Sequence, residues 1–228
     1  MNWITNNLEL IGDRTLQHLA IALPPILLSF VLAIPLGWLA NRFASTRGLV
    51  LTIAGLLYAI PSLPLFIALA AILGTAQRDP INVGVALTLY GLALMVRSAA
   101  DGFSSVDSDV AQSATAMGFS TAGRFWKVDL PLAGPVLLAG LRVVAVSTIS
   151  LTTVGAVLGI QSLGSLFTDG FARNIQAEIW AGIITTMALA LLVDLLIVRV
   201  GRLVMPWTRA DRVRKKPRDR AAVRAVLS

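Results

Sequence analysis

The chain consists of long apolar runs separated by short polar stretches. We interpret five of these runs as membrane-crossing helices, because a hydrocarbon core of about 30 Å needs about 20 apolar residues in a helix. The runs cover approximately residues 18–40, 49–73, 81–96, 131–160 and 179–204. The pattern therefore predicts an all-α integral membrane protein with five spans.

The overall composition supports this prediction and narrows the possible chemistry. Of 228 residues, 56% are hydrophobic and only 14% are charged, which is well outside the usual makeup of soluble domains. The chain has no cysteine, so disulfides, thiolate metal sites and cysteine nucleophiles are excluded. The one histidine, His18, has no evident set of metal-ligand partners in the sequence.

The distribution of lysine and arginine predicts the orientation of the chain. Basic residues in short loops stay preferentially on the cytoplasmic side. With the N-terminus outside and the C-terminus inside, fifteen basic residues lie inside and three lie outside. Residues 1–14 are then an extracytoplasmic segment, and residues 205–228 form a basic cytoplasmic tail. We expect the tail to bind anionic lipid. It has no aromatic stacking platform after Trp207, so nucleic-acid binding is not expected.

Several prolines interrupt the apolar runs, namely Pro24, Pro25, Pro35, Pro61 and Pro64. Each proline removes a backbone donor and favours a kink. Breaks in a membrane helix are tolerated where neighbouring protein or a water-lined cavity satisfies the freed carbonyls. The prolines are therefore compatible with a transport pathway, and structural kinks explain them equally well.

An inside loop over residues 98–130 separates the third and fourth spans and is long enough to contain structure of its own. Asp109 and Gln112 have the spacing of a capping box, which predicts a short helix that begins there. Gly118 is placed to end this helix in the left-handed conformation. Ser120 or Thr121 can then cap a second short helix before the next span.

The first of these loop helices has a small apolar stripe, which is formed by Val110, Ala111, Ala114 and Met117. A cytosolic helix of this kind, connected to two membrane spans, is suited to insertion into a groove on another protein. Force applied to the helix would move both spans. The alternative interpretation is an interfacial helix that lies on the membrane surface.

The loop resembles the EAA coupling motif of binding-protein-dependent ABC importer permeases, whose pattern is EAA-x3-G-x9-I-x-LP. The matching residues are Gln112-Ser113-Ala114, Gly118 and Val128-Asp129-Leu130-Pro131. Glutamine replaces the glutamate of the motif, serine replaces its first alanine and valine replaces its isoleucine. This resemblance implies that the residues that couple the chain to an ATPase are Asp109, Ala111, Gln112, Ser113, Ala114, Met117, Gly118, Leu130 and Pro131.

Further segments resemble the glycine betaine, carnitine and choline branch of these permeases. They include residues 60–66, 89–90, 96–97, 139–142 and 159–164. The resemblance implies a type I importer transmembrane domain over residues 15–204, in a bacterial cytoplasmic membrane. It also implies a second permease subunit, which is identical or paralogous, and an extracytoplasmic solute-binding protein. Cytosolic ATPases would bind the ATP and Mg²⁺, so that this chain would hold no cofactor and catalyse no reaction.

Two other functions remain open at this point. A permease for another small solute, such as methionine or another amino acid, would share the fold and the coupling loop. A membrane alcohol-phosphotransferase could instead bind Mg²⁺ through Asp101, Asp107 and Asp109. That class should show further aspartates at helical spacing after a downstream glycine, and none appears before Asp129.

Two ionisable residues lie within the predicted spans. Arg142 is near the middle of the fourth span, and Asp194 is in the inner half of the fifth. Charged groups at membrane depth are costly and are functional candidates by default. We expect Arg142 to face the protein interior and to pair with Asp194 or with backbone carbonyls. The pair has a structural role or belongs to the transport pathway, and no residue is assigned to solute binding.

Overall fold

A computed structural model describes residues 2–208, apart from the side chains of residues 2 and 44–46. From residue 209 onward, the predicted lipid-binding tail lies outside the described residues. The described residues form α1 (Asn2–Asn6), α2 (Leu8–Arg42), α3 (Ala44–Ala59), α4 (Ser62–Leu73), α5 (Pro80–Ser104), α6 (Ser108–Ala116), α7 (Thr121–Arg124), the π-helical turn η1 (Phe125–Asp129), α8 (Leu130–Thr152), the 3₁₀ turn η2 (Thr153–Leu158), α9 (Ser165–Ala172) and α10 (Gln176–Val204).

The helices confirm an all-helical membrane fold. Among the described residues, four helical segments are long and apolar enough to cross a membrane: Leu8–Arg42, Pro80–Ser104, Thr121–Leu158 and Gln176–Val204. A fifth span results if the bent pair formed by α3 and α4 is counted as one. Helix α2, which contains the first predicted span, already begins at Leu8, so residues 8–14 are continuous with that span.

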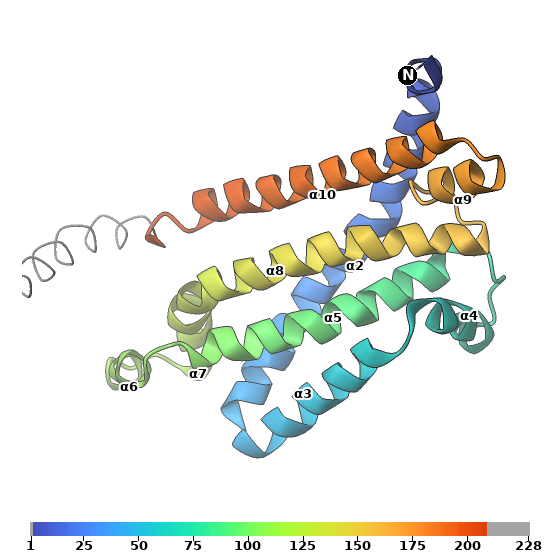
Figure 1. Ribbon diagram of the computed structural model, residues 1–228. Coiled ribbons are helices and arrows are strands. Elements are labelled where there is room, and N and C mark those ends of the chain that lie inside the picture. Colours follow the sequence, from blue (N-terminus) through green and yellow to red (C-terminus); the bar gives the residue numbers. More distant parts are fainter. Residues whose placement is uncertain (1, 209–228) are drawn as a thin grey trace, which may run out of the picture.

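Helix α5 lies at the centre of the bundle. It packs against α2, α3, α4 and α8, while α10 packs against α8 and α9. Figure 1 shows α5 and α8 side by side, with α2 crossing behind them. The α2–α5 contact is close because it contains small residues. A Cβ at Gly37 would collide with Ala99, and one at Gly91 would lie 2.7 Å from Ser29 Oγ. These two glycines let the helix backbones approach each other, as is common between membrane helices.

The prolines act differently in the first and second predicted spans. Helix α2 continues through Pro24, Pro25 and Pro35, whereas the second span bends by 100° between α3 and α4. Pro61 lacks a backbone N–H, and the preceding residue, Ile60, has the extended conformation that a following proline favours. The hydroxyl of Tyr90 donates to the Ile60 carbonyl at 2.7 Å. Neighbouring protein thus satisfies a carbonyl that the break exposes.

Candidate coupling loop and intramembrane ion pair

The two short helices of the predicted loop are present between α5 and α8. Figure 1 shows α6 and α7 at the end of α5 and the start of α8, on the side of the bundle where α10 ends. Helix α6 contacts α7 and η1, and η1 in turn contacts α8. The loop therefore protrudes from the bundle and joins it through a short helical connection.

Helix α6 begins two residues earlier than predicted. Asp107 is its N-cap, since its Oδ1 accepts a hydrogen bond from the Asp109 backbone N–H at 2.8 Å. The predicted cap at Asp109, with Gln112 as its capping-box partner, is wrong. Asp107 has a non-helical backbone that suits a cap, while Asp109 lies inside the first turn. There its charge interacts favourably with the helix dipole.

Replacing Asp107 by alanine should loosen the start of α6 more than replacing Asp109. Loss of an N-cap costs about 1 kcal/mol, whereas loss of an exposed first-turn carboxylate costs about 0.3–1 kcal/mol. Hydrogen exchange of the backbone amides of residues 109–112 in the purified permease measures this difference. We expect several-fold faster exchange in Asp107→Ala than in Asp109→Ala. Equal exchange in the two variants would contradict the assignment of the cap.

The predicted apolar stripe has one buried edge and one exposed edge. Ala114 is buried, with 2% of its surface exposed, and Ala111 is half-buried. Next to Ala114 on the helix surface, Val110 is 43% exposed and Met117 is 72% exposed. Residues seven apart lie on nearly the same side of an α-helix. Val110 and Met117 thus form one outward apolar surface, and the two alanines attach α6 to the bundle.

Other predicted coupling residues lie around this helix. Gln112 and Ser113 are exposed, whereas Leu130 and Pro131 are half-buried at the start of α8. Gly118 ends α6 with φ of +85°, as predicted. The Phe119 N–H donates to the Ala114 carbonyl at 3.2 Å and the Gly118 N–H donates to the Thr115 carbonyl at 3.0 Å. These bonds form a Schellman motif, in which the left-handed residue is usually glycine.

The second loop helix is capped as predicted by Ser120, whose Oγ accepts a hydrogen bond from the Gly123 N–H at 3.1 Å. Helix α7 then leads into η1. The Phe125 ring lies 5.4 Å from Trp38 of α2 and 5.9 Å from Phe103 of α5, measured between ring centroids. These aromatic contacts fix η1 against two membrane helices.

Arg124 connects α6 with the start of α8, and the sequence did not indicate this role. Its Nε donates to Asp129 Oδ2 at 3.3 Å, and its Nη1 donates to Thr115 Oγ1 at 3.4 Å. Asp129 is only 6% exposed. Residues five apart do not face each other on an α-helix, but the π-helical turn places one extra residue between them. Movement of α6 can therefore reach α8 through the Arg124 side chain as well as through the backbone.

The two intramembrane charges form the pair that the sequence suggested. Arg142 donates to Asp194 through Nε at 2.6 Å and through Nη2 at 2.8 Å. The Asp194 side chain is 16% exposed and the Arg142 side chain is 45% exposed. The prediction that Arg142 faces the protein interior is therefore wrong for the isolated chain. The side chain reaches across from α8 to α10 along the surface of the bundle, and its outer part stays uncovered.

The three carboxylates considered for a phosphotransferase serve separate structural roles. Asp101 accepts a hydrogen bond from Arg47 Nη2 at 2.9 Å, and Asp107 caps α6. Asp109 lies in the first turn of that helix. Over residues 2–208, no group of three or more histidine, aspartate or glutamate side chains is arranged to hold a metal ion.

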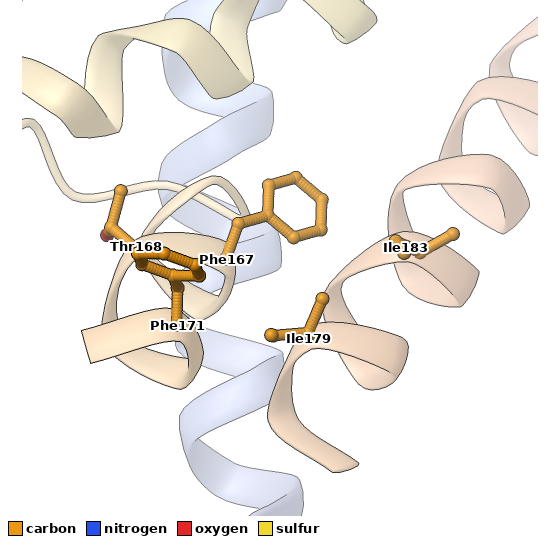
Figure 2. Close-up of a pocket in the computed structure, with 5 residues that line it drawn as sticks. All are labelled: Phe167, Thr168, Phe171, Ile179 and Ile183. Atoms are coloured by element: carbon orange, nitrogen blue, oxygen red, sulfur yellow. The ribbon is translucent and has the colours of Figure 1, made fainter. Parts of the chain in front are cut away.

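A groove of about 520 Å³ lies between α9 and α10. Figure 2 shows the side chains that line it, which are Phe167, Thr168, Phe171, Ile179 and Ile183. This lining is aromatic and aliphatic apart from one hydroxyl. It suits an apolar group and carries no side chain for acid–base chemistry. Figure 1 places α9 and the start of α10 at the end of the bundle opposite α6.

The fold and the loop define a class of protein, namely a transport subunit that is embedded in a membrane. A helical loop protrudes between two of its spans. The family described as "Binding-protein-dependent transport system inner membrane component" matches residues 21–206, and the chain belongs to this family. It is a multi-pass inner membrane protein and the permease subunit of an ABC importer. It works with a binding protein and a separate ATPase, and is not itself an enzyme.

Several known proteins are similar to the chain over most of its length. The glycine betaine/carnitine/choline transport system permease protein OpuCD of Bacillus subtilis is 30% identical over 83% of this chain and 82% of its own length. The osmoprotectant import permease protein OsmW of Salmonella typhimurium is 28% identical, with coverages of 90% and 97%. The solved structure of the MetNI methionine ABC transporter in an inward-facing conformation has a TM-score of 0.78. It is 19% identical, and the match covers 87% of this chain and 98% of that one.

Proposed function

We propose that the chain is the permease of an importer for compatible solutes of the glycine betaine, carnitine or choline type. The observation that carries this proposal is the 30% identity to OpuCD over 83% of the chain. Such solutes share a quaternary ammonium group, which aromatic faces select through cation–π attraction. We expect this selection to occur mainly in the separate binding protein.

The protruding shape of the loop supports a coupling mechanism. In our proposal, α6 is inserted into a groove of the ATPase through Val110 and Met117. ATP binding brings two ATPases together and draws the attached loops with them. Arg124 and η1 pass this movement to α8, α5 and α2. The membrane helices of two permease chains then alternate between outward and inward exposure, because nucleotide binds the two conformations with different affinity.

The orientation predicted from the basic residues supports the same arrangement. With the C-terminus inside, α6 and α7 lie on the side of the ATPases, and α9 lies on the side of the binding protein. The basic residues of the 209–228 segment would then contact anionic lipid of the inner leaflet. Labelling of single cysteines in intact cells tests this orientation, because the natural chain has none. A cysteine at position 109 should react only after permeabilisation.

Reconstitution tests the solute. The chain is purified with its ATPase and binding protein, placed in vesicles and supplied with ATP. We expect uptake of radiolabelled glycine betaine, carnitine or choline, and faster ATP hydrolysis when the binding protein is loaded. Uptake of methionine or another amino acid that quaternary ammonium solutes do not inhibit would contradict the proposed solute. It would leave the role as an importer permease intact.

A further inference from the structure

The Arg142–Asp194 pair leaves part of the guanidinium group unused. Asp194 accepts hydrogen bonds from Nε and Nη2, which together form one edge of the planar group. An arginine has five N–H donors. The three others, two on Nη1 and one on Nη2, have no hydrogen-bond acceptor within residues 2–208. Since the side chain is 45% exposed, this second edge is open to an additional acceptor.

The position of Arg142 in the helix makes this open edge costly. The residue lies about 18 Å along α8 from its start at Leu130, at 1.5 Å per residue. This distance places it near the middle of the membrane. Unsatisfied donors of a charged group are expensive in hydrocarbon. The open edge must therefore face water, a solute or a second protein chain.

The exposed surface around Arg142 contains small, polar and aliphatic residues. On the same face of α8, the exposed neighbours within about two turns are Pro135, Ala139, Val146 and Ser150, and Val143 next to Arg142 is 57% exposed. On α10, Leu191 and Leu195 close to Asp194 are 59% and 49% exposed. The small side chain of Ala139 and the hydroxyl of Ser150 leave room and a second polar group on the face that carries the charge, and an ionisable residue at membrane depth is a functional candidate by default.

We infer that Arg142 is a carboxylate-binding residue of the solute pathway. Its open edge would donate two parallel hydrogen bonds to the carboxylate of a small zwitterion that also carries a quaternary ammonium group. Asp194 is a positioning residue that holds the guanidinium plane and balances its charge while the pathway is empty. A partly neutralised arginine binds an anion weakly enough to release it, as transport requires. This inference rests on the proposed function.

The test compares a solute with a carboxylate, glycine betaine, and one without, choline. Arg142→Lys keeps a positive charge beside Asp194 but removes the second donor edge. We expect the initial uptake rate of glycine betaine by the reconstituted importer to fall about tenfold or more, in line with loss of a charge-assisted contact. The uptake rate of choline should stay within about twofold. Arg97→Lys is the matched control, because Arg97 is an exposed arginine of α5, and it should change neither rate.

The outcomes separate this inference from the proposed function. Equal loss of both uptakes in Arg142→Lys overturns the inference, since a structural contact does not distinguish the two solutes. A wild-type importer that takes choline alone also overturns it and leaves the proposed function standing. If the wild type takes neither solute and does not take carnitine, the proposed function itself fails. A further outcome is a wild type that takes glycine betaine alone. In that case, Arg142→Lys should lose uptake while the loaded binding protein still stimulates ATP hydrolysis. Loss of both uptake and stimulation overturns the inference.

A second variant covers the case in which Arg142→Lys does not assemble. The double variant Arg142→Asp with Asp194→Arg keeps an ion pair between α8 and α10 but moves the guanidinium to the other helix. We expect it to co-purify with the ATPase and to import choline at least fivefold better than glycine betaine, each relative to wild type. Equal recovery of both uptakes would show that only the pair matters, and would overturn the inference.

Discussion

Replacing Gly118 by valine is expected to separate ATP hydrolysis from solute uptake. Gly118 has φ of +85°, and a Cβ built there meets no atom within 4 Å. The substitution therefore acts through the backbone alone. A left-handed conformation costs a residue other than glycine about 1–3 kcal/mol, and a β-branched residue is among the least tolerant. The end of α6 and the path to α7 must rearrange.

The measurement compares uptake with ATP hydrolysis in the same reconstituted vesicles. We expect uptake to fall on the order of 10- to 100-fold, which corresponds to 1–3 kcal/mol of conformational strain. Membrane insertion should be unchanged, because the loop lies outside the spans. Hydrolysis should continue but lose its dependence on the loaded binding protein.

Two controls decide whether the left-handed backbone is the cause. Gly118→Asn should retain most of the coupling, because asparagine tolerates this conformation better than other residues with a side chain. Gly12→Val introduces the same side chain at another open position, where a Cβ also meets no atom within 4 Å. It should leave uptake close to normal. Equal effects of Gly118→Val and Gly118→Asn would contradict the explanation, and so would normal uptake in the valine variant.

Features that depend on a long segment or on one special residue could be predicted from the sequence. Apolar runs of membrane length leave few alternatives to a helix, because every backbone donor in lipid must be satisfied within the segment. Gly118 was predictable because glycine after a short helical pattern commonly marks its left-handed end. The pairing of Arg142 with Asp194 was predictable because an unpaired charge at membrane depth is too costly.

Features that depend on the neighbouring helices could not be predicted in this way. Three prolines lie within a continuous α2, while Pro61 lies in a 100° break. The sequence around Pro61 does not reveal that Tyr90, on another helix, satisfies the carbonyl of Ile60. The exposure of the Arg142 side chain could not be predicted either, because it depends on how far α8 and α10 cover that side chain.

The N-cap of α6 and the Arg124–Asp129 pair could not be predicted, because each depends on the backbone conformation of single residues. Asp107 and Asp109 are both good capping residues, and the capping-box spacing favoured the second. The backbone conformation of Asp107 decided in favour of the first. The Arg124–Asp129 pair required a π-helical turn, and a spacing of five residues between opposite charges gives no helical signal. This connection between α6 and α8 could therefore not be predicted from the sequence.

Aspartate in place of both Val110 and Met117 is expected to release the ATPase from the permease. These side chains form the outward apolar surface of α6 and are 43% and 72% exposed. If they fill a groove on the ATPase, the variant must bury two carboxylates without partners in the complex. Such burial costs several kcal/mol. We expect the amount of ATPase that co-purifies with the permease to fall at least tenfold, and solute uptake to be lost with it.

The control places the same charge on the same helix but on another side. Ser108→Asp introduces a carboxylate at the first helical position of α6, where it interacts favourably with the dipole. Residue 108 lies about half a turn around the helix axis from both Val110 and Met117, at 100° per residue. This variant should keep the ATPase bound. If α6 instead lies on the membrane surface, the Val110/Met117 variant would leave the lipid and still co-purify with the ATPase, and that result would contradict docking through this surface.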